Sequence, residues 1–278
     1  MIDENKVKSI RDRLKKIAND TNAPIQAVVT DFLIERAVFR LASDPILKDH
    51  LVFKGGYVGL RCYQSPRYTI DLDAIAHNRE IDEILVKSKS AMDLNMSDLV
   101  WFELEKEIDL ATQNEYGGIC LQYRAGIGEK PRNLKKAQII KVDIGIGDPV
   151  TPRPVHKKLL EKLGEGSITW QVYNVETIIA EKLHCLISRA SDNSRSKDVF
   201  DLAYYLPQCH KETLMDAIRK TFAYRGDALP AKIHEVIAEI NRDTLKRGWK
   251  AATGLLVTQP DFDSCFDTIL KWFQSNDI

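Results

Sequence analysis

The stretch that decides the fold is residues 67–75, which read Arg67-Tyr68-Thr69-Ile70-Asp71-Leu72-Asp73-Ala74-Ile75. Polar and apolar side chains alternate along it with a period of two, which is typical of a half-buried β-strand. The alternation places Thr69, Asp71 and Asp73 on one face. Ile70 and Leu72 then lie on the other face, which can reach a core. The sequence therefore predicts a strand that presents two carboxylates side by side.

A second alternating stretch, residues 137–146, predicts another strand of the same sheet. Asp143 shares its polar face with Lys141, while isoleucine and valine fill the other face. If the two strands are neighbours, Asp143 becomes a third carboxylate beside the first pair. Hard oxygen ligands of this kind suit Mg²⁺, and a pair of Mg²⁺ ions supports phosphoryl or nucleotidyl transfer. We therefore expect Asp71, Asp73 and Asp143 to hold two Mg²⁺ ions.

A Gly55-Gly56 pair precedes Asp71 by fifteen residues, after the apolar run 51–54 and before a helical stretch at 57–63. Glycine lets backbone N–H groups approach a phosphate at a helix N-terminus. Lys54 and Arg67 lie nearby in the sequence and can add positive charge. Together with the Asp-x-Asp pair, these residues predict a phosphate-binding turn.

The rest of the sequence predicts helical segments before and after the sheet in the chain. Helices are expected at 4–19, 25–41, 45–50, 79–91, 175–188 and 197–206, with three or four more up to residue 273. Further strands are expected at 101–111 and 118–124, and a loop or short exposed helix at 151–167. The predicted fold class is α+β: a small mixed sheet flanked by N-terminal and C-terminal helical segments. The predicted domains are residues 1–170 and 171–278.

Composition excludes several protein classes. The 278 residues carry forty Lys and Arg against forty Asp and Glu, so no global field attracts nucleic acid or lipid, and any such contact needs a local patch. No apolar run approaches the roughly 18 residues of a membrane span, and the N-terminus lacks a secretory pattern. The five scattered cysteines form no C-x-x-C pair, which argues against structural zinc and for reduced thiols. We expect a cytoplasmic protein without a membrane partner.

The motifs together resemble those of AbiEii/AbiGii-type nucleotidyltransferase toxins, which belong to the DNA polymerase β-like nucleotidyltransferase superfamily. The resemblance starts at Phe53-Lys54-Gly55-Gly56 and continues through residues 67–73. Downstream, residues 180–183 (Ala-Glu-Lys-Leu), Arg189 and residues 197–202 (Lys-Asp-Val-Phe-Asp-Leu) match further family signatures. The likeness spans most of residues 1–206.

The resemblance implies a role for each matching residue. The expected catalytic residues are Asp71, Asp73, Asp143, Lys182 and Asp198. The expected nucleotide-binding residues are Lys54, Gly55, Gly56, Tyr57, Arg67 and Lys182. In the family, Asp71 and Asp73 would hold Mg²⁺, Lys182 would contact phosphate and Asp198 would complete the site. Two positions depart from the family pattern: Tyr57 replaces a small hydroxyl residue, and Lys197 replaces an arginine and so loses its bidentate fork.

The implied function is a Mg²⁺-dependent nucleotidyltransferase, the toxin of a bacterial toxin–antitoxin system. It would transfer NMP from an NTP, its co-substrate, to an acceptor hydroxyl. The resemblance suggests the 3′ end of tRNA as acceptor and an antitoxin encoded nearby as partner. The alternatives are another Asp-x-Asp enzyme, such as a phosphatase or glycosyltransferase, and a non-catalytic RNA- or protein-binding relative. Arg242, Lys246 and Lys250 recur every four residues and form either a solvated face or an RNA-backbone track.

Overall fold

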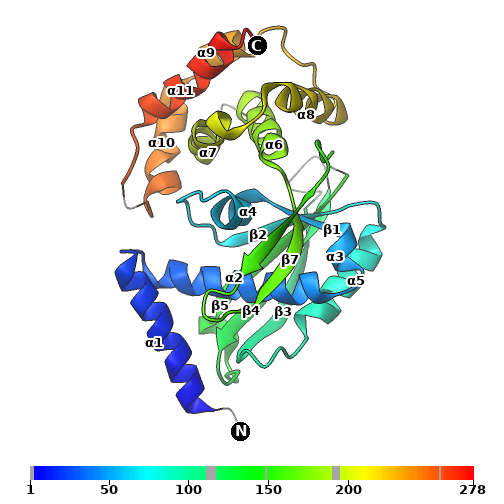
Figure 1. The fold of residues 1–278 in the computed structure, drawn as a ribbon, viewed down its shortest axis with the longest axis vertical. Helices are drawn as coiled ribbons and strands as arrows, with labels where there is room; N and C mark the ends of the chain where they lie inside the picture. The colour runs from blue at the N-terminus through cyan, green and yellow to red at the C-terminus, as the bar shows by residue number, and fades with distance from the viewer. Residues whose placement is uncertain (1–2, 111–116, 148, 190–194, 257) are drawn as a thin grey trace. The chain divides into compact units, whose positions relative to one another are not determined.

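The computed structural model describes residues 3–110, 117–147, 149–189, 195–256 and 258–278. The chain divides into two compact units (Figure 1). The first comprises Met1–Gln64, Tyr68–Gly147 and Val155–Val172, and contains the sheet. The second comprises Ser65–Arg67, Asp148–Pro154 and Tyr173–Ile278, and is helical. Two short segments, one before each of two strands, thus belong by their packing to the helical unit.

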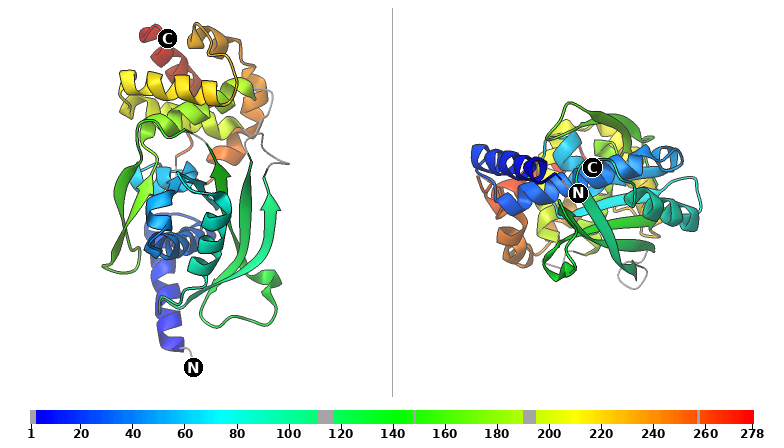
Figure 2. Two further views of the ribbon diagram at one scale, coloured as in Figure 1. Left: turned by 90° about the vertical axis from the view of Figure 1, so that its right-hand side faces the viewer. Right: turned by 90° about the horizontal axis from the view of Figure 1, so that it is seen from below.

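A seven-stranded mixed sheet forms the centre of the first unit, in the order β3-β4-β5-β2-β1-β7-β6. The strands are β1 (Leu51–Lys54), β2 (Asp71–Ala76), β3 (Val100–Asp109), β4 (Gly118–Ile127), β5 (Gln138–Ile146), β6 (Val155–Leu160) and β7 (Ser167–Val172). The pairs β2–β5 and β1–β7 are parallel, and the other neighbours are antiparallel. Figure 2 shows the long strands β3, β4 and β5 running together with a marked twist.

Among the described residues of this unit, the α-helices that accompany the sheet are α1 (Glu4–Asp20), α2 (Ile25–Ser43), α3 (Leu47–His50), α4 (Gly55–Cys62) and α5 (Ile81–Met92). A short 3₁₀ turn, η1 (Leu134–Lys136), precedes β5. The central helix is α2, which crosses the sheet against β5 and β7 (Figure 1). Pro24 starts α2 with a fixed φ of −57°, and most of its residues are buried.

Buried ion pairs fix α4 on α2. Arg61 of α4 places its Nη1 atom 3.2 Å from the Asp31 carboxylate and its Nη2 atom 2.8 Å from that of Glu35. Both carboxylates are almost completely buried. Loss of Arg61 would leave the buried Glu35 carboxylate without the cation of Arg61, which costs about 3–5 kcal/mol, whereas Asp31 would keep Lys162, whose Nζ atom lies 2.7 Å away. The network therefore holds the helix that begins at Gly55.

The second unit consists of α6 (Val175–Ser188), α7 (Ser196–Tyr205), η3 (Leu206–Gln208), α8 (Lys211–Tyr224), α9 (Ile233–Glu239), α10 (Arg242–Thr253) and α11 (Phe262–Ser275). Helix α7 packs against α6, α10 and α11. Phe266 and Phe273 of α11 are fully buried and contribute to this unit's core. No helix among the described residues has both the length and the apolar character that crossing a membrane requires.

The predicted α+β class with a mixed sheet is confirmed, and two local predictions are wrong. Strand β2 begins at Asp71 rather than at Arg67, and the Ile70 side chain is 64% exposed instead of facing the core. Residues 151–167 are neither a loop throughout nor a helix, because β6 occupies Val155–Leu160 and β7 begins at Ser167. Strand β6 lies at the sheet edge, where charged side chains are favoured and conceal the strand pattern.

Candidate active site

Asp73 lies at the centre of the candidate site because β2 runs between β1 and β5. In the strand register, Asp73 is opposite Lys54 on β1 and opposite Asp143 on β5. The two alternating strands are thus neighbours, which was the condition for Asp143 to lie beside the first acidic pair. Leu72 and Val142, one residue earlier on each strand, are fully buried on the other face. Period-two alternation therefore presents the carboxylates of Asp73 and Asp143 on a common face of the sheet.

The turn from β1 to α4 comes very close to Asp73. Gly55 has a φ of +70°, a conformation that side-chain-bearing residues rarely adopt. A Cβ atom at this position would overlap the Asp73 carboxylate. Glycine is required here for both reasons, and its absence of a side chain brings the backbone of the predicted phosphate-binding turn next to the acidic pair.

Asp143 is held by a residue that the sequence did not single out. The thiol of Cys120, directly opposite on β4, donates a hydrogen bond to the Asp143 carboxylate. The Oδ1 atom of Asp143 is buried and has no hydrogen-bond partner. Burial raises the pKa of Asp143, the Cys120 hydrogen bond opposes this rise and the nearby Asp73 charge adds to it, so that the pKa is above its ordinary value. Only the pairing of β4 with β5 reveals Cys120.

The acidic residues fit a metal ion only in part. Across the described portions of the chain, no three His, Cys, Asp or Glu side chains are gathered as a ready-made metal site. The buried, unpartnered Oδ1 atom of Asp143 is nevertheless the kind of atom that a cation satisfies. Mg²⁺ commonly takes one or two carboxylates and completes its octahedron with waters and substrate phosphates. The carboxylates of Asp71, Asp73 and Asp143 suit an ion that arrives with the nucleotide.

Tyr57 requires a correction, because its side chain is completely buried and does not line an open phosphate site. Its hydroxyl accepts a hydrogen bond from Arg61 at 3.0 Å and lies 3.5 Å from the Asp31 carbonyl oxygen. The aromatic ring packs edge-on against Trp170. Any contact of residue 57 with nucleotide is therefore left to its backbone.

In the second unit, three predicted site residues meet around Asp201, which the sequence analysis gave no role. The Lys182 Nζ atom lies 2.6 Å from the Asp201 carboxylate and 3.2 Å from that of Asp198. Arg67 donates two hydrogen bonds to Asp201, at 3.0 and 2.8 Å. Arg195 adds a contact of 3.2 Å to Asp198. Arg67 was predicted to bind the nucleotide, but in the structure its guanidinium is paired with the buried Asp201 carboxylate.

Electrostatics keep this cluster ionised. Burial alone would raise the pKa of Asp201, but Lys182 and Arg67 outweigh it and lower the pKa to about 2. Burial correspondingly works against the charge of Lys182, whose pKa is raised overall by Asp201 and Asp198. Both aspartates are almost fully buried. The cluster is a buried, charged element of the helical unit.

The predicted site residues therefore form two sets. Asp71, Asp73, Asp143, Lys54, Gly55 and Gly56 belong to the first unit, and Lys182, Asp198 and Arg67 to the second. The late basic stripe is largely neutralised, since Arg242 lies 2.9 Å from Asp267 and Lys246 lies 2.8 Å from Asp263. These pairs favour its interpretation as a solvated face over an RNA track.

Comparison with known proteins gives the family. Residues 36–268 match the family described as "Nucleotidyl transferase AbiEii toxin, Type IV TA system". A search of curated proteins found no match. Among solved structures, JHP933 from Helicobacter pylori has a TM-score of 0.51 at 17% identity, covering 91% of this chain and 92% of that one.

Two further structures are also similar. A putative nucleotidyltransferase from H. pylori has a TM-score of 0.49 at 18% identity, covering 90% of this chain and 94% of that one. An antigenic nucleotidyltransferase-like protein from Paracoccidioides brasiliensis has a TM-score of 0.40 at 15% identity, covering 72% and 88%. The family description supports a nucleotidyltransferase over the phosphatase, glycosyltransferase and non-catalytic alternatives, and implies an antitoxin partner. Since the match extends over most of its length, the chain belongs to the AbiEii nucleotidyltransferase toxin family of type IV toxin–antitoxin systems.

Proposed function

We propose that this protein transfers a nucleoside monophosphate from an NTP to the 3′-terminal hydroxyl of tRNA and releases pyrophosphate. The proposal names the acceptor and the metal ion, which family membership leaves open. The observation that best supports it is the alignment of Asp73 with Asp143 on adjacent parallel strands, beside the Gly55 turn. Carboxylates and close-approaching backbone amides are what a metal-bound triphosphate requires.

The first unit's residues would divide the work. Asp71 and Asp73, with the unpartnered Oδ1 atom of Asp143, would hold Mg²⁺, which when bound would neutralise negative charge on the triphosphate and on the departing pyrophosphate. The backbone amides of Gly55 and Gly56 bind phosphate oxygens. Asp143 orients the acceptor hydroxyl and takes its proton as the hydroxyl oxygen bonds to the α-phosphorus and the bond from this phosphorus to the bridging oxygen breaks. Its raised pKa brings it closer to that of an effective base.

The helical unit contributes a second part of the proposal. From the family resemblance, Lys182 is expected to contact phosphate and Asp198 to complete the site. Lys182 already compensates two carboxylates, so its charge is fixed in place by Asp201 and Asp198. The cognate antitoxin, which we expect to be encoded nearby, would oppose this activity.

The test is nucleotide transfer by the purified protein with Mg²⁺, total tRNA and each α-³²P-labelled NTP in turn. Asp73→Asn and Asp143→Asn are expected to reduce labelling of tRNA at least 100-fold, because each removes a charge at the reacting centre. Asp267→Asn is the matched control, since Asp267 is a half-exposed carboxylate on α11. Label on the protein itself would overturn the proposal that tRNA is the acceptor. The absence of labelling with every NTP would overturn the proposed reaction.

A further inference from the structure

Two segments of the first unit carry a large surplus of positive charge. Helix α1 has six lysines and arginines against three acids, and residues 129–136 have four against one. The whole chain has no net charge. A local excess of this size on a neutral protein is the electrostatic footprint of a polyanion-binding surface.

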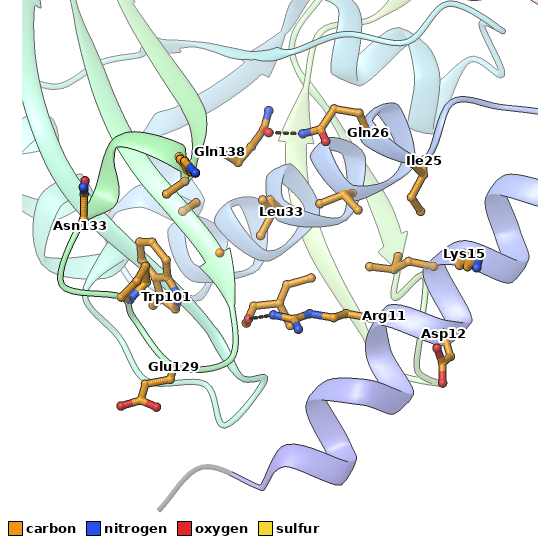
Figure 3. A pocket seen from close by; sticks show the side chains of 18 residues that line it. Arg11, Asp12, Lys15, Ile25, Gln26, Leu33, Trp101, Glu129, Asn133 and Gln138 are labelled. Carbon is orange, nitrogen blue, oxygen red and sulfur yellow. Dashed lines mark hydrogen bonds between the residues drawn. The ribbon is translucent and has the colours of Figure 1, made fainter.

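A cavity of about 810 Å³ lies between these two segments (Figure 3). Arg11 and Lys15 of α1 line one side, and Lys136 lines the other. Leu33, Ala125 and Trp101 are among the apolar residues that line it. The acidic residues of the lining are Asp12 and Glu129. We call this cavity with its basic borders, α1 and residues 129–136, the basic cleft.

The cations of the basic cleft are accessible. Arg11 points from α1 toward β4 and donates one hydrogen bond, from Nη2 to the Ile127 carbonyl oxygen at 3.0 Å (Figure 3). This bond uses no carboxylate, so the charge of Arg11 is not compensated by it. Lys15 and Lys136 are exposed, and neither is paired with a carboxylate in the part of the chain that the structure describes.

The late basic stripe gives the contrast. There, Asp263 and Asp267 of α11 neutralise Arg242 and Lys246 of α10. An exposed cation that already has a carboxylate partner gains little from a phosphate, because it must give up one anion for another. Within the basic cleft, Lys130 is likewise paired, with Glu103 at 2.6 Å, whereas Arg11, Lys15 and Lys136 have no such cost.

We infer that the basic cleft binds the sugar–phosphate backbone of RNA, an inference that rests on the proposed function in which RNA is the acceptor. Lysine and arginine neutralise phosphates and release condensed counterions, which supplies most of the affinity of such contacts. Gln26 donates a hydrogen bond to Gln138 within the cavity lining, so these two amides are already engaged, while the side-chain amide of Asn133 at the border can add a hydrogen bond to RNA (Figure 3).

The basic cleft is separate from the acidic residues of the site. Gln138, which lines it, begins β5, and Asp143 follows five residues later, about 17 Å along the strand. The odd number of residues also places the two side chains on opposite faces of the sheet. The basic cleft would therefore bind a part of the RNA that is distant from the reacting 3′ hydroxyl. Such binding lowers KM without changing kcat.

The experiment measures binding of fluorescently labelled tRNA by anisotropy, without NTP, over a range of salt concentrations. Arg11→Gln/Lys15→Gln/Lys136→Gln is expected to weaken binding at least tenfold. It should also lower the slope of log K against log salt by about two, since each lost phosphate contact contributes about 0.7–0.9. Lys15→Gln/Lys136→Gln, which changes only exposed side chains, should show most of the effect and guards against loss of the Arg11–Ile127 bond.

Two control variants sharpen the result. Arg242→Gln/Lys246→Gln removes two positive charges from the neutralised stripe, as many as Lys15→Gln/Lys136→Gln removes from the basic cleft, and should leave RNA binding unchanged. Asp12→Asn/Glu129→Gln removes two negative charges from the cavity lining and should increase the affinity for tRNA. Unchanged affinity and salt slope in the triple variant would overturn the inference. Displacement of RNA by polyglutamate of equal charge with equal affinity would also overturn it, and would assign the basic cleft to an acidic protein.

The outcome is independent of catalysis. RNA binding that depends on these cations supports the inference even if no nucleotide is transferred, in which case only the proposed reaction fails. If tRNA is the acceptor, the triple variant should raise KM for tRNA at least tenfold and leave kcat within about twofold. A fall in kcat with unchanged KM would contradict a role in anchoring the RNA.

Discussion

The carboxylate of Asp73 occupies the space into which any side chain at Gly55 would project. The two residues come from different elements, β2 and the start of α4, and are joined through the antiparallel pairing of Lys54 with Asp73. Gly55 also has a positive φ of +70°. Two independent reasons therefore require glycine at position 55: the left-handed backbone conformation, and the contact that a side chain would make with Asp73 of the candidate site.

Gly55→Ala is expected to reduce nucleotide transfer at least 100-fold, because the new methyl group must displace the Asp73 carboxylate. The protein should also lose about 1–3 kcal/mol of unfolding free energy, of which roughly 1–2 kcal/mol comes from the left-handed backbone alone. The measurements are kcat/KM for the NTP and urea unfolding.

Gly117→Ala is the matched control for this prediction. Gly117 has nearly the same φ, +72°, but a Cβ atom there would meet nothing within 4 Å. Gly117→Ala should lose unfolding free energy because of its left-handed backbone, but should keep its nucleotide-transfer activity. If both alanine variants lose activity equally, backbone strain explains the effect and the contact with Asp73 has no special role.

The position of the acidic strands was predictable from the sequence because their signal is local. Period-two alternation marks β2 and β5, and carboxylates on a common face follow from it. Ile70 does not face the core because β2 begins only at Asp71, so the alternation, which starts at Arg67, extends four residues beyond the strand. Strand β6 was missed because three consecutive residues, His156 to Lys158, are exposed at the sheet edge.

The parts of the candidate site that depend on packing were not predictable. Cys120 is far from any motif, and only the β4–β5 register places it opposite Asp143. Tyr57 was expected at the nucleotide because of its place after the glycines, whereas α4 turns its side chain into the core toward Arg61. The central place of Asp201 in the charged cluster follows only from its ion pairs with Arg67 and Lys182, which the sequence does not show.

Cys120 is expected to be a positioning residue for Asp143. Cys120→Ala removes the hydrogen-bond donor and should lower kcat about tenfold or more with little change in KM for the NTP. Cys120→Ser keeps a donor and should retain kcat within about threefold. The two variants have similar volumes, so thermal stability serves as the control. If both variants lose kcat in proportion to stability, Cys120 is only a packing residue.

Tyr57→Phe is expected to affect stability and not nucleotide binding. The substitution removes the hydroxyl that accepts a hydrogen bond from Arg61 and should cost about 1 kcal/mol. For a chain of this size, the corresponding fall in Tm is about 2–4 °C. KM for the NTP should stay unchanged, because the side chain is fully buried. A several-fold rise in KM without loss of Tm would show that the hydroxyl reaches the nucleotide after all.

Asp201 is expected to make the protein acid-sensitive. Although burial works in the opposite direction, Lys182 and Arg67 lower the pKa of Asp201 to about 2, against an ordinary value of 3.8. A carboxyl whose pKa is lower in the folded state contributes stability above the unfolded pKa and loses it as the pH falls through the folded one. The unfolding free energy should therefore drop by on the order of 2 kcal/mol through Asp201 alone between about pH 4 and pH 2.

Urea unfolding from pH 6 to pH 3 of the wild type, Asp201→Asn and Asp267→Asn measures this contribution. Asp201→Asn should be less stable than the wild type at pH 6, because it leaves Lys182 and Arg67 facing a neutral group in a buried cluster. Its stability should then fall less steeply with acid, so that the two curves approach each other below pH 4. Asp267→Asn, changed at a half-exposed position, should run parallel to the wild type. Parallel curves for Asp201→Asn would mean that the carboxylate is not stabilised by its two cations.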